Sequence, residues 1–173
     1  ASGAVTALLN QYDGLLPIGL AVFPTDSVCT TGSFVVEPAY STKLDITSRL
    51  AGFKPPSIDP DTPTCSAIDT LRAANAYKDA SRSQYILLVT DGDPYCRNTI
   101  CGGGDLVTKT VAAITAAKNQ TPSVHTFVVG FGGNLPMTLK ANLDRMAQAG
   151  GEPNPDAAYD YYPADSQQAL LTQ

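Results

Sequence analysis

Three continuous runs of apolar residues are the strongest pattern in the chain. They are "IGLAVF" (18–23), "YILLVT" (85–90) and "HTFVVGF" (125–131), and all three are rich in branched side chains. Short runs of this kind are typical of strands that are buried on both faces of a parallel sheet. We therefore expect three such strands, well separated along the chain.

Between these runs the apolar residues recur with helical spacing. Three stretches each carry an apolar stripe at i, i+4 and i+7, which places the apolar side chains on one face of a helix. The stripes are Ala67, Leu71 and Ala74; Val107, Val111 and Ile114; and Leu139, Leu143 and Met146. Strands that alternate with helices of this type predict a layered α/β domain.

Weaker patterns predict the remaining elements. The segment "GSFVVEP" (32–38) ends on proline, which suits an edge strand because proline cannot donate to a neighbouring strand. A helix is expected over 41–52, a short last strand within 157–165, and a truncated helix over 166–172. Because no linker or repeat interrupts the pattern, we expect residues 1–173 to form a single domain.

Composition and charge narrow the kinds of partner. The 173 residues are 43% hydrophobic, which fits a globular domain, and 11 basic against 16 acidic side chains give a net charge of −5. This charge disfavours a general attraction to nucleic acid or anionic lipid and favours a cation as a small partner. No apolar run approaches the roughly 20 residues that a transmembrane helix needs.

The four cysteines fall in or beside expected loops. They are Cys29, Cys65, Cys96 and Cys101. An even number of loop cysteines indicates disulfides and hence an extracytoplasmic location, at a cell surface, in the periplasm or in a secreted protein. A zinc site and free thiols are the alternatives, but the chain has a single histidine, which gives zinc little support.

Two segments place oxygen ligands at one expected rim of the sheet. Asp91 directly follows the strand at 85–90, and parallel α/β sheets bind ligands beyond the carboxyl ends of their strands. In the other segment, Thr62 is expected to cap a helix that has Pro63 at its first position. A hydroxyl and a carboxylate suit a hard cation. The alternative is that Asp91 and Asp93 only form an Asx-type turn.

An ordered set of segments resembles the von Willebrand factor A domain family. "ILLVTDG" and "DTPTCSAI" resemble its third and second metal-site motifs, "PIGLAVFP" and "HTFVVGFG" its second and fifth strands, and "YDYYPADSQQALLTQ" its last strand and helix. The resemblance spans essentially the whole chain. It implies a three-layer, doubly wound, Rossmann-like α/β fold with a mostly parallel central sheet and one antiparallel edge strand.

The same resemblance implies a metal-ion-dependent adhesion site. Thr62 and Asp91 would bind Mg²⁺ or another divalent cation, with Asp93 and Asp61 as further acidic groups around the ion. An acidic side chain of a protein partner would complete the coordination of the metal. The resemblance therefore implies protein binding without catalysis.

One element of the family has no counterpart in this sequence. The first motif, D-x-S-x-S, should end a first strand upstream of the helix expected within 1–12, and in the family's strand order 3-2-1-4-5-6 this strand separates 18–23 from 85–90. We expect a strand from a missing N-terminal segment or from another chain to fill that position. Without the motif, we expect this chain alone to bind Mg²⁺ weakly.

On that scaffold all four cysteines lie on the carboxyl-end face of the sheet. We expect Cys96 to pair with Cys101 and Cys29 with Cys65, although four cysteines allow three connectivities.

Two other classes of function remain as alternatives. A scaffold in a larger assembly would keep the fold and leave the metal site silent. A Mg²⁺-dependent phosphohydrolase would use Asp91 and Asp93 as a catalytic pair, but Lys109 and Lys118 lie on faces that the pattern predicts to be solvated. His125 begins its strand at the end away from the rim, which gives histidine-assisted nucleophilic catalysis little support. We expect a binding domain that is not an enzyme.

Overall fold

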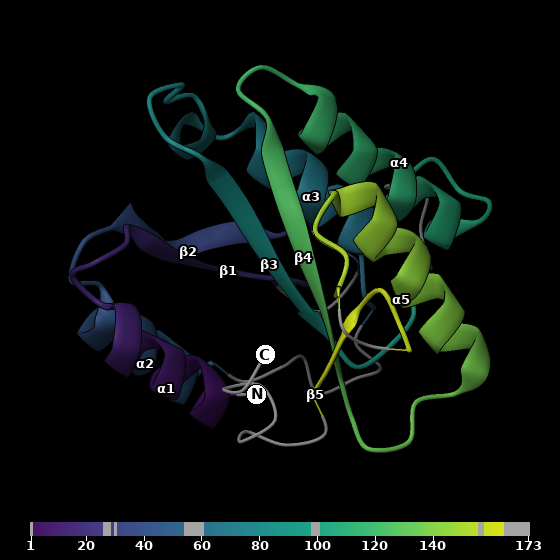
Figure 1. Cartoon of the computed structure of the whole chain (residues 1–173), viewed down its shortest axis with the longest axis horizontal. Coiled ribbons are helices and arrows are strands. Elements are labelled where there is room, and N and C mark those ends of the chain that lie inside the picture. The colour runs from purple at the N-terminus through teal and green to yellow at the C-terminus, as the bar shows by residue number, and fades with distance from the viewer. Residues whose placement is uncertain are drawn as a thin grey trace.

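The computed structural model describes residues 2–25, 29, 31–53, 61–97, 101–155 and 158–164 (Figure 1). The elements are α1 (Ser2–Tyr12), β1 (Ile18–Val22), β2 (Ser33–Ala39), α2 (Lys43–Gly52), α3 (Thr64–Ala73), the 3₁₀ turn η1 (Asn75–Tyr77), β3 (Gln84–Thr90), α4 (Leu106–Asn119), β4 (Val124–Phe131), α5 (Met137–Gly150) and β5 (Tyr162–Ala164). The helix expected over 166–172 lies outside the described residues. None of the helices in the described ranges combines the length and apolar character needed to cross a membrane.

The strands form two separate sheets. β1 and β2 pair antiparallel, whereas β3, β4 and β5 form a parallel sheet in that order. The pairing of β3 with β4 runs from Gln84 opposite Val124 to Thr90 opposite Gly130. This mixed α/β arrangement is Rossmann-like, which confirms the expected fold class. The two sheets part between β1 and β3, where the sequence predicted that a central strand is missing.

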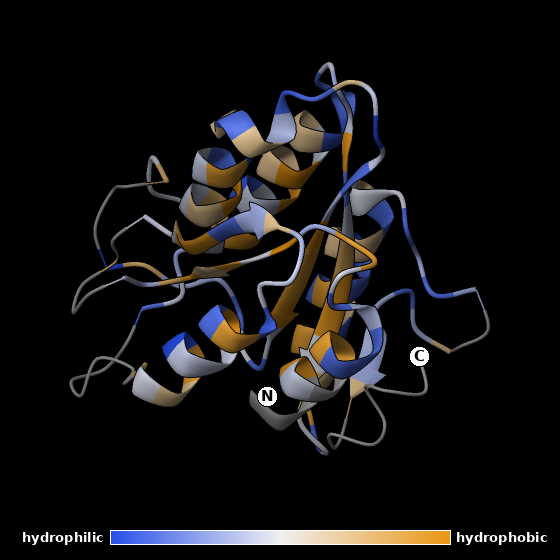
Figure 2. Ribbon diagram, turned by 90° about the vertical axis from the view of Figure 1, so that its left-hand side faces the viewer, coloured by the Kyte–Doolittle hydropathy of each residue, from blue (hydrophilic) through white to orange (hydrophobic). Residues whose placement is uncertain are grey.

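Helices α3, α4 and α5 cover one face of the parallel sheet and form the core with it (Figure 1). The predicted stripes of α4 and α5 face this core, which confirms their helical spacing. The stripe on α3 is confirmed only in part, because Leu71 lies in the core but Ala74 follows the last residue of the helix. Figure 2 shows the apolar residues concentrated along the strands of the parallel sheet. The largest fully buried side chains of this core include Ile68, Ile114, Val128, Leu143 and Met146.

The other face of β3 is not buried, so the prediction of burial on both faces is wrong for this strand. Its side chains alternate, with Ile86 and Leu88 buried and Tyr85 and Leu87 50% and 47% exposed. The Tyr85 ring lies 5.7 Å from the Phe127 ring on β4, measured between centroids. The strand is apolar on both faces, but the described helices cover only one of them.

Helix α2 begins two residues later than predicted, at Lys43. Ser41 has a φ of 61°, which lies in the left-handed region and cannot start a right-handed helix. The Thr42 hydroxyl donates to the carbonyl of Ile18 at 2.7 Å, and the amide of Lys43 donates to the Asp13 carboxylate at 3.1 Å. These bonds attach the start of α2 to β1 and to the residue that follows α1.

Tyr77, in η1, contacts both sheets. Its hydroxyl donates to the carbonyl of Tyr85 on β3 at 3.3 Å, and its ring centroid lies 6.2 Å from that of Phe34 on β2. Burial disfavours the phenolate and raises the pKa of Tyr77 to about 12. The neutral form of this side chain is therefore part of the folded structure.

Tyr77→Phe should change how stability depends on alkaline pH. A raised folded-state pKa gives stability that is complete below the unfolded-state value of 10.0 and is lost as pH rises towards about 12. Between pH 8 and pH 11 the wild type should therefore lose roughly 1.4 kcal/mol of unfolding free energy that the variant keeps. Urea unfolding at both pH values measures this, with Tyr40→Phe at an exposed tyrosine as control. A constant difference between wild type and Tyr77→Phe would contradict the prediction.

Gly130→Ala should destabilise the junction between β4 and α5. A Cβ at Gly130 would lie 2.7 Å from Leu143 Cδ1 and 2.7 Å from a ring carbon of Tyr161, both in the core. We expect a loss of about 1 to 3 kcal/mol, as for other overpacked cores. Gly133→Ala is the matched control, because its Cβ would meet nothing within 4 Å. Chemical denaturation of the two variants should separate them clearly, and equal stabilities would refute the packing described here.

Candidate functional site

Asp91 lies at the carboxyl end of β3, as predicted. The turn that carries it is held by Thr90, whose hydroxyl donates to the carbonyl of Gly92 at 3.0 Å and accepts from its amide at 3.4 Å. Asp91 is exposed, and Asp93 accepts a hydrogen bond from Asn142 on α5 at 2.9 Å. The hydroxyl of Thr90 therefore supports this turn, and Asp91 lies exposed directly after the end of the strand.

Thr62 is brought to the same loop by its backbone. Its amide donates to the carbonyl of Tyr95 at 2.7 Å, and its carbonyl accepts from the amide of Tyr95 at 3.0 Å. This antiparallel bridge joins the segment before α3 to the segment that leaves β3, four residues beyond Asp91. The two predicted ligands therefore lie on adjoining segments of one rim.

The predicted helix cap at Thr62 is wrong. Helix α3 begins at Thr64, its N-cap residue is Pro63, and no side chain caps it. The reason is the bridge to Tyr95, which keeps Thr62 extended and one residue too far from the helix. The side chain of Thr64 instead donates to the carbonyl of Thr62 at 3.3 Å.

Asp61 is buried, with a side chain only 1% exposed. Its carboxylate accepts from the Arg97 backbone amide at 3.2 Å and from Arg97 Nε at 3.1 Å. This ion pair balances the charge of Asp61 inside the protein, where an unpaired carboxylate would be costly. Asp61 therefore already has a cationic partner, whereas Asp91 lies exposed at the rim.

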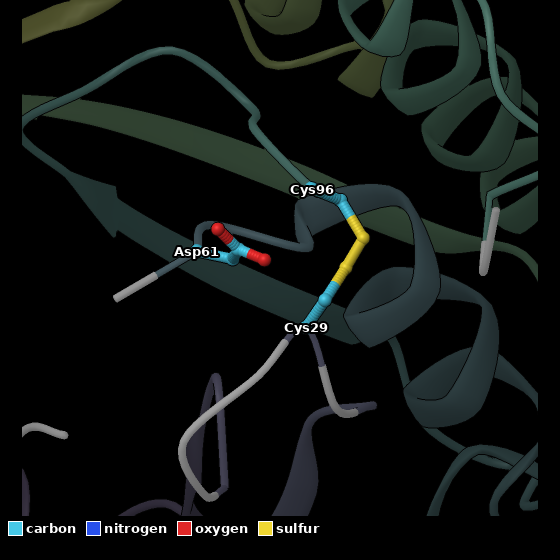
Figure 3. Close-up of side chains that lie close together, drawn as sticks. All are labelled: Cys29, Asp61 and Cys96. Carbon is cyan, nitrogen blue, oxygen red and sulfur yellow. A yellow bond between two sulfur atoms is a disulfide. The ribbon is translucent and has the colours of Figure 1, made fainter. Parts of the chain in front are cut away.

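Asp61 also lies beside the sulfurs of Cys29 and Cys96 (Figure 3). One carboxylate oxygen and the two sulfurs are all within 4.8 Å of one another, a grouping that could suggest a metal site. The two sulfurs are bonded to each other, however, and a disulfide has no thiolate to offer a metal. We interpret the cluster as a covalent cross-link with an ion pair next to it.

The structure confirms disulfides but corrects their expected pairing. Cys29 is bonded to Cys96 and Cys65 to Cys101, with Cα–Cα distances of 5.4 and 6.2 Å. The bridge at Tyr95 holds the neighbouring Cys96 next to Asp61 and Cys29, whereas Cys101 lies against the first turn of α3 at Cys65. Closeness in sequence between Cys96 and Cys101 was therefore misleading. Two disulfides are compatible with an extracellular location.

The oxygen atoms at the rim are of the kind that a hard cation binds, but only two residues, Thr62 and Asp91, are expected to supply them. Thr62 would offer a neutral oxygen and Asp91 a charged one, while Asn142 orients the Asp93 carboxylate. Mg²⁺ takes oxygen ligands, keeps several waters and is commonly held by one or two carboxylates. Two protein ligands are consistent with the weak binding expected for this chain alone. Metal binding at Thr62 and Asp91 stays a prediction.

His125 lies at the opposite end of the sheet from Asp91. Its Nδ1 is 2.8 Å from a carboxylate oxygen of Glu152, and both side chains are partly exposed. Sequence reasoning did not identify Tyr95, Arg97 or Asn142, which position the rim. They carry no recognisable motif, because their roles arise from contacts between segments that are distant in sequence.

Comparisons with known proteins support the fold. No protein-family profile and no curated protein sequence matches the chain. A solved structure, that of proximal thread matrix protein 1 from the mussel byssus, is similar over 99% of this chain, with a TM-score of 0.64 and 14% sequence identity. The chain spans 37% of the length of that protein's chain. At this identity the similarity concerns the arrangement of the elements and assigns no role to any residue.

Tryptic mapping without reduction tests the disulfide pairing directly. Trypsin places each cysteine in a separate peptide, namely 1–43, 50–72, 83–97 and 98–109. We expect 1–43 to be linked to 83–97, and 50–72 to be linked to 98–109. A peptide of 83–97 joined to 98–109 would show instead that Cys96 pairs with Cys101.

Proposed function

We propose that this chain is a von Willebrand factor A-like domain that binds other proteins through a divalent cation held by Thr62 and Asp91. The observation that carries the proposal is the backbone bridge between Thr62 and Tyr95, which brings the two segments to one rim. The strand-end position of Asp91 and the Rossmann-like fold support it further.

The cation would link the two proteins by charge. When bound, it would supply a positive centre with an exchangeable coordination position, which an acidic side chain of the partner would fill. Thr62 and Asp91 would hold the ion, and Asn142 would keep the Asp93 carboxylate fixed nearby. The partners that follow are a protein with an exposed acidic residue and a strand that completes the sheet. Two disulfides suit a protein that acts outside the cytoplasm.

A structural role in a larger assembly is the second candidate. The similar solved structure is that of a thread matrix protein, and this chain spans 37% of it. In that role the fold would be retained as a building unit and the rim would bind no metal.

Hydrolysis is less well supported than binding. A phosphohydrolase that used Asp91 and Asp93 would need a cationic group beside them to orient substrate. Lys118 lies instead against Gly151, which bridges to Thr126 near the start of β4, at the opposite end of the sheet. Lys109 lies by Gly102 and lines a pocket with Cys65, Asp69 and Cys101, beside the second disulfide. We therefore propose that the domain is not an enzyme.

Titration with Mg²⁺, followed by NMR of the backbone amides, tests the metal proposal. We expect shifts confined to the amides around Thr62 and Asp91, with a Kd weaker than about 0.1 mM, because two protein ligands are few for this ion. Asp91→Asn and Thr62→Val should each abolish these shifts. Asp45→Asn, on the exposed first turn of α2, is the matched control and should leave them unchanged.

Three results of these measurements would change the interpretation. Micromolar binding would contradict the weak affinity expected here. An absence of shifts at Thr62 and Asp91 would refute the metal site and favour the structural role. Hydrolysis of p-nitrophenyl phosphate that requires Mg²⁺ and is lost in Asp91→Asn would favour catalysis over binding.

A further inference from the structure

The two disulfides of this domain have different surroundings. Cys29 and Cys65 are both buried, with 0% and 3% of their surface exposed. Cys101, in contrast, is partly exposed, and together with Cys65 it lines a pocket of about 330 Å³. The pocket therefore gives a small molecule access to the second disulfide, between Cys65 and Cys101.

The walls of this pocket combine apolar and charged side chains. Three alanines of α4 form an apolar wall, and Asp69 and Lys109 supply the charges. Asp69 is paired with Arg72, at 2.7 Å between Oδ1 and Nε. Among the described residues no carboxylate pairs with Lys109, which is exposed. The pocket therefore keeps one positive charge that favours an anionic ligand.

Positive charge also lies close to the second disulfide itself. The Lys109 ammonium nitrogen is 3.7 Å from the point where a Cβ on Gly102, next to Cys101, would lie. Cys65 is the second residue of α3, and its amide and that of Ser66 have no hydrogen-bond acceptor among the described residues. Unpaired amides in the first turn of a helix and a nearby lysine both stabilise a thiolate. Cys65 is therefore a good leaving group when another thiolate attacks the bond.

The first disulfide lacks these features. One carboxylate oxygen of Asp61 lies within 4.8 Å of the sulfurs of Cys29 and Cys96 (Figure 3). Asp61 is paired with Arg97, so this ion pair has no net charge to attract a thiolate, and Cys29 has no exposed surface to attack. We therefore expect the two disulfides to differ in reactivity.

We propose that the disulfide between Cys65 and Cys101 is a site of thiol–disulfide exchange that accepts small anionic thiols. The thiolate of the ligand attacks Sγ of Cys101, the residue with more exposed surface, and forms a mixed disulfide with it. The electron pair of the broken bond stays on Sγ of Cys65, which leaves as a thiolate in the first turn of α3. No oxidant is needed, because one sulfur–sulfur bond forms as another breaks. The reaction needs no cation and is independent of the proposed metal site.

The exchange would change one defined connection of the fold. The bond that breaks joins the start of α3 to the loop before α4. Thr62 is held by its own bridge to Tyr95, and the disulfide between Cys29 and Cys96 still joins the two sheets. The ligand would therefore become attached covalently and reversibly while the rest of the domain stays folded.

Reaction of the folded 173-residue chain with 2-mercaptoethanesulfonate, an anionic thiol, tests the proposal. Samples are trapped with N-ethylmaleimide and digested with trypsin without reduction. We expect the thiol on peptide 98–109 and maleimide on peptide 50–72, with the link between 1–43 and 83–97 intact. The second disulfide should be lost about tenfold faster than the first, because attack requires an accessible sulfur. In urea, where both disulfides are accessible, the two rates should become similar.

The charge of the pocket is tested with a second thiol and with variants, followed by intact mass. The rate of each thiol is divided by its rate with bis(2-hydroxyethyl) disulfide, which removes differences in intrinsic reactivity. The anionic thiol should then react about fivefold faster than cysteamine, a cationic thiol, as expected for a partly screened charge. Lys109→Met should largely remove this preference, and Lys109→Arg should keep it. Lys78→Met, which removes the same charge at an exposed site after η1, is the matched control and should leave the preference unchanged.

Four outcomes would overturn the proposal. Equal rates for the two disulfides in the folded chain, or no reaction at all, would show that the pocket does not expose the second disulfide. The thiol on peptide 50–72 would show that Cys65 is the sulfur under attack. A rate difference that persists in urea would have its cause in the local sequence and not in the pocket. A charge preference that Lys109→Met leaves unchanged would show that Lys109 does not attract the thiol.

Discussion

The disulfide between Cys29 and Cys96 is the constraint on which the arrangement of this domain depends. No described hydrogen-bond ladder joins the two sheets, so their relative position is set by this covalent bond and by packing on α3 and η1. The bond closes a loop of 67 residues. A cross-link of this span lowers the conformational entropy of the unfolded chain and so stabilises the folded state by about 4 kcal/mol. It also lies directly beside the ion pair of Asp61 and Arg97.

The residues of the candidate rim are connected to that disulfide by a short series of contacts. Arg97 follows Cys96 and neutralises Asp61, and Asp61 precedes Thr62, whose backbone pairs with Tyr95. The contact between Asp61 and Arg97 joins residues that are 36 positions apart in sequence. Asp91 is not part of this network and remains exposed at the end of β3. The same few bonds therefore tie the two sheets together and hold Thr62 at the rim.

Structural features that are determined within one continuous segment of the chain could be predicted from the sequence. Features that are determined by contact between two distant segments could not. The apolar runs identified β3 and β4 because a buried strand needs such a run, and the position of Asp91 follows from the end of β3. The stripe of Leu139, Leu143 and Met146 identified α5, because a helix that packs on a sheet needs apolar residues along one face. In contrast, the disulfide pairing and the start of α3 depend on the bridge between Thr62 and Tyr95, which no local pattern indicates. The exposure of Leu87 depends on which helices cover the sheet, and its own sequence context is that of a buried residue.

The 67-residue loop closed by Cys29 and Cys96 has a mechanical consequence. If tension were applied to the two ends of the chain, the force would pass through the sulfur–sulfur bond and bypass the residues between them. With about 3.4 Å of contour per residue, roughly 230 Å of polypeptide could not be drawn out while that bond is intact. The bypassed stretch contains β2, α2, α3 and β3. The domain would therefore lengthen under load only from its outer segments, and its central part would be shielded from the pull.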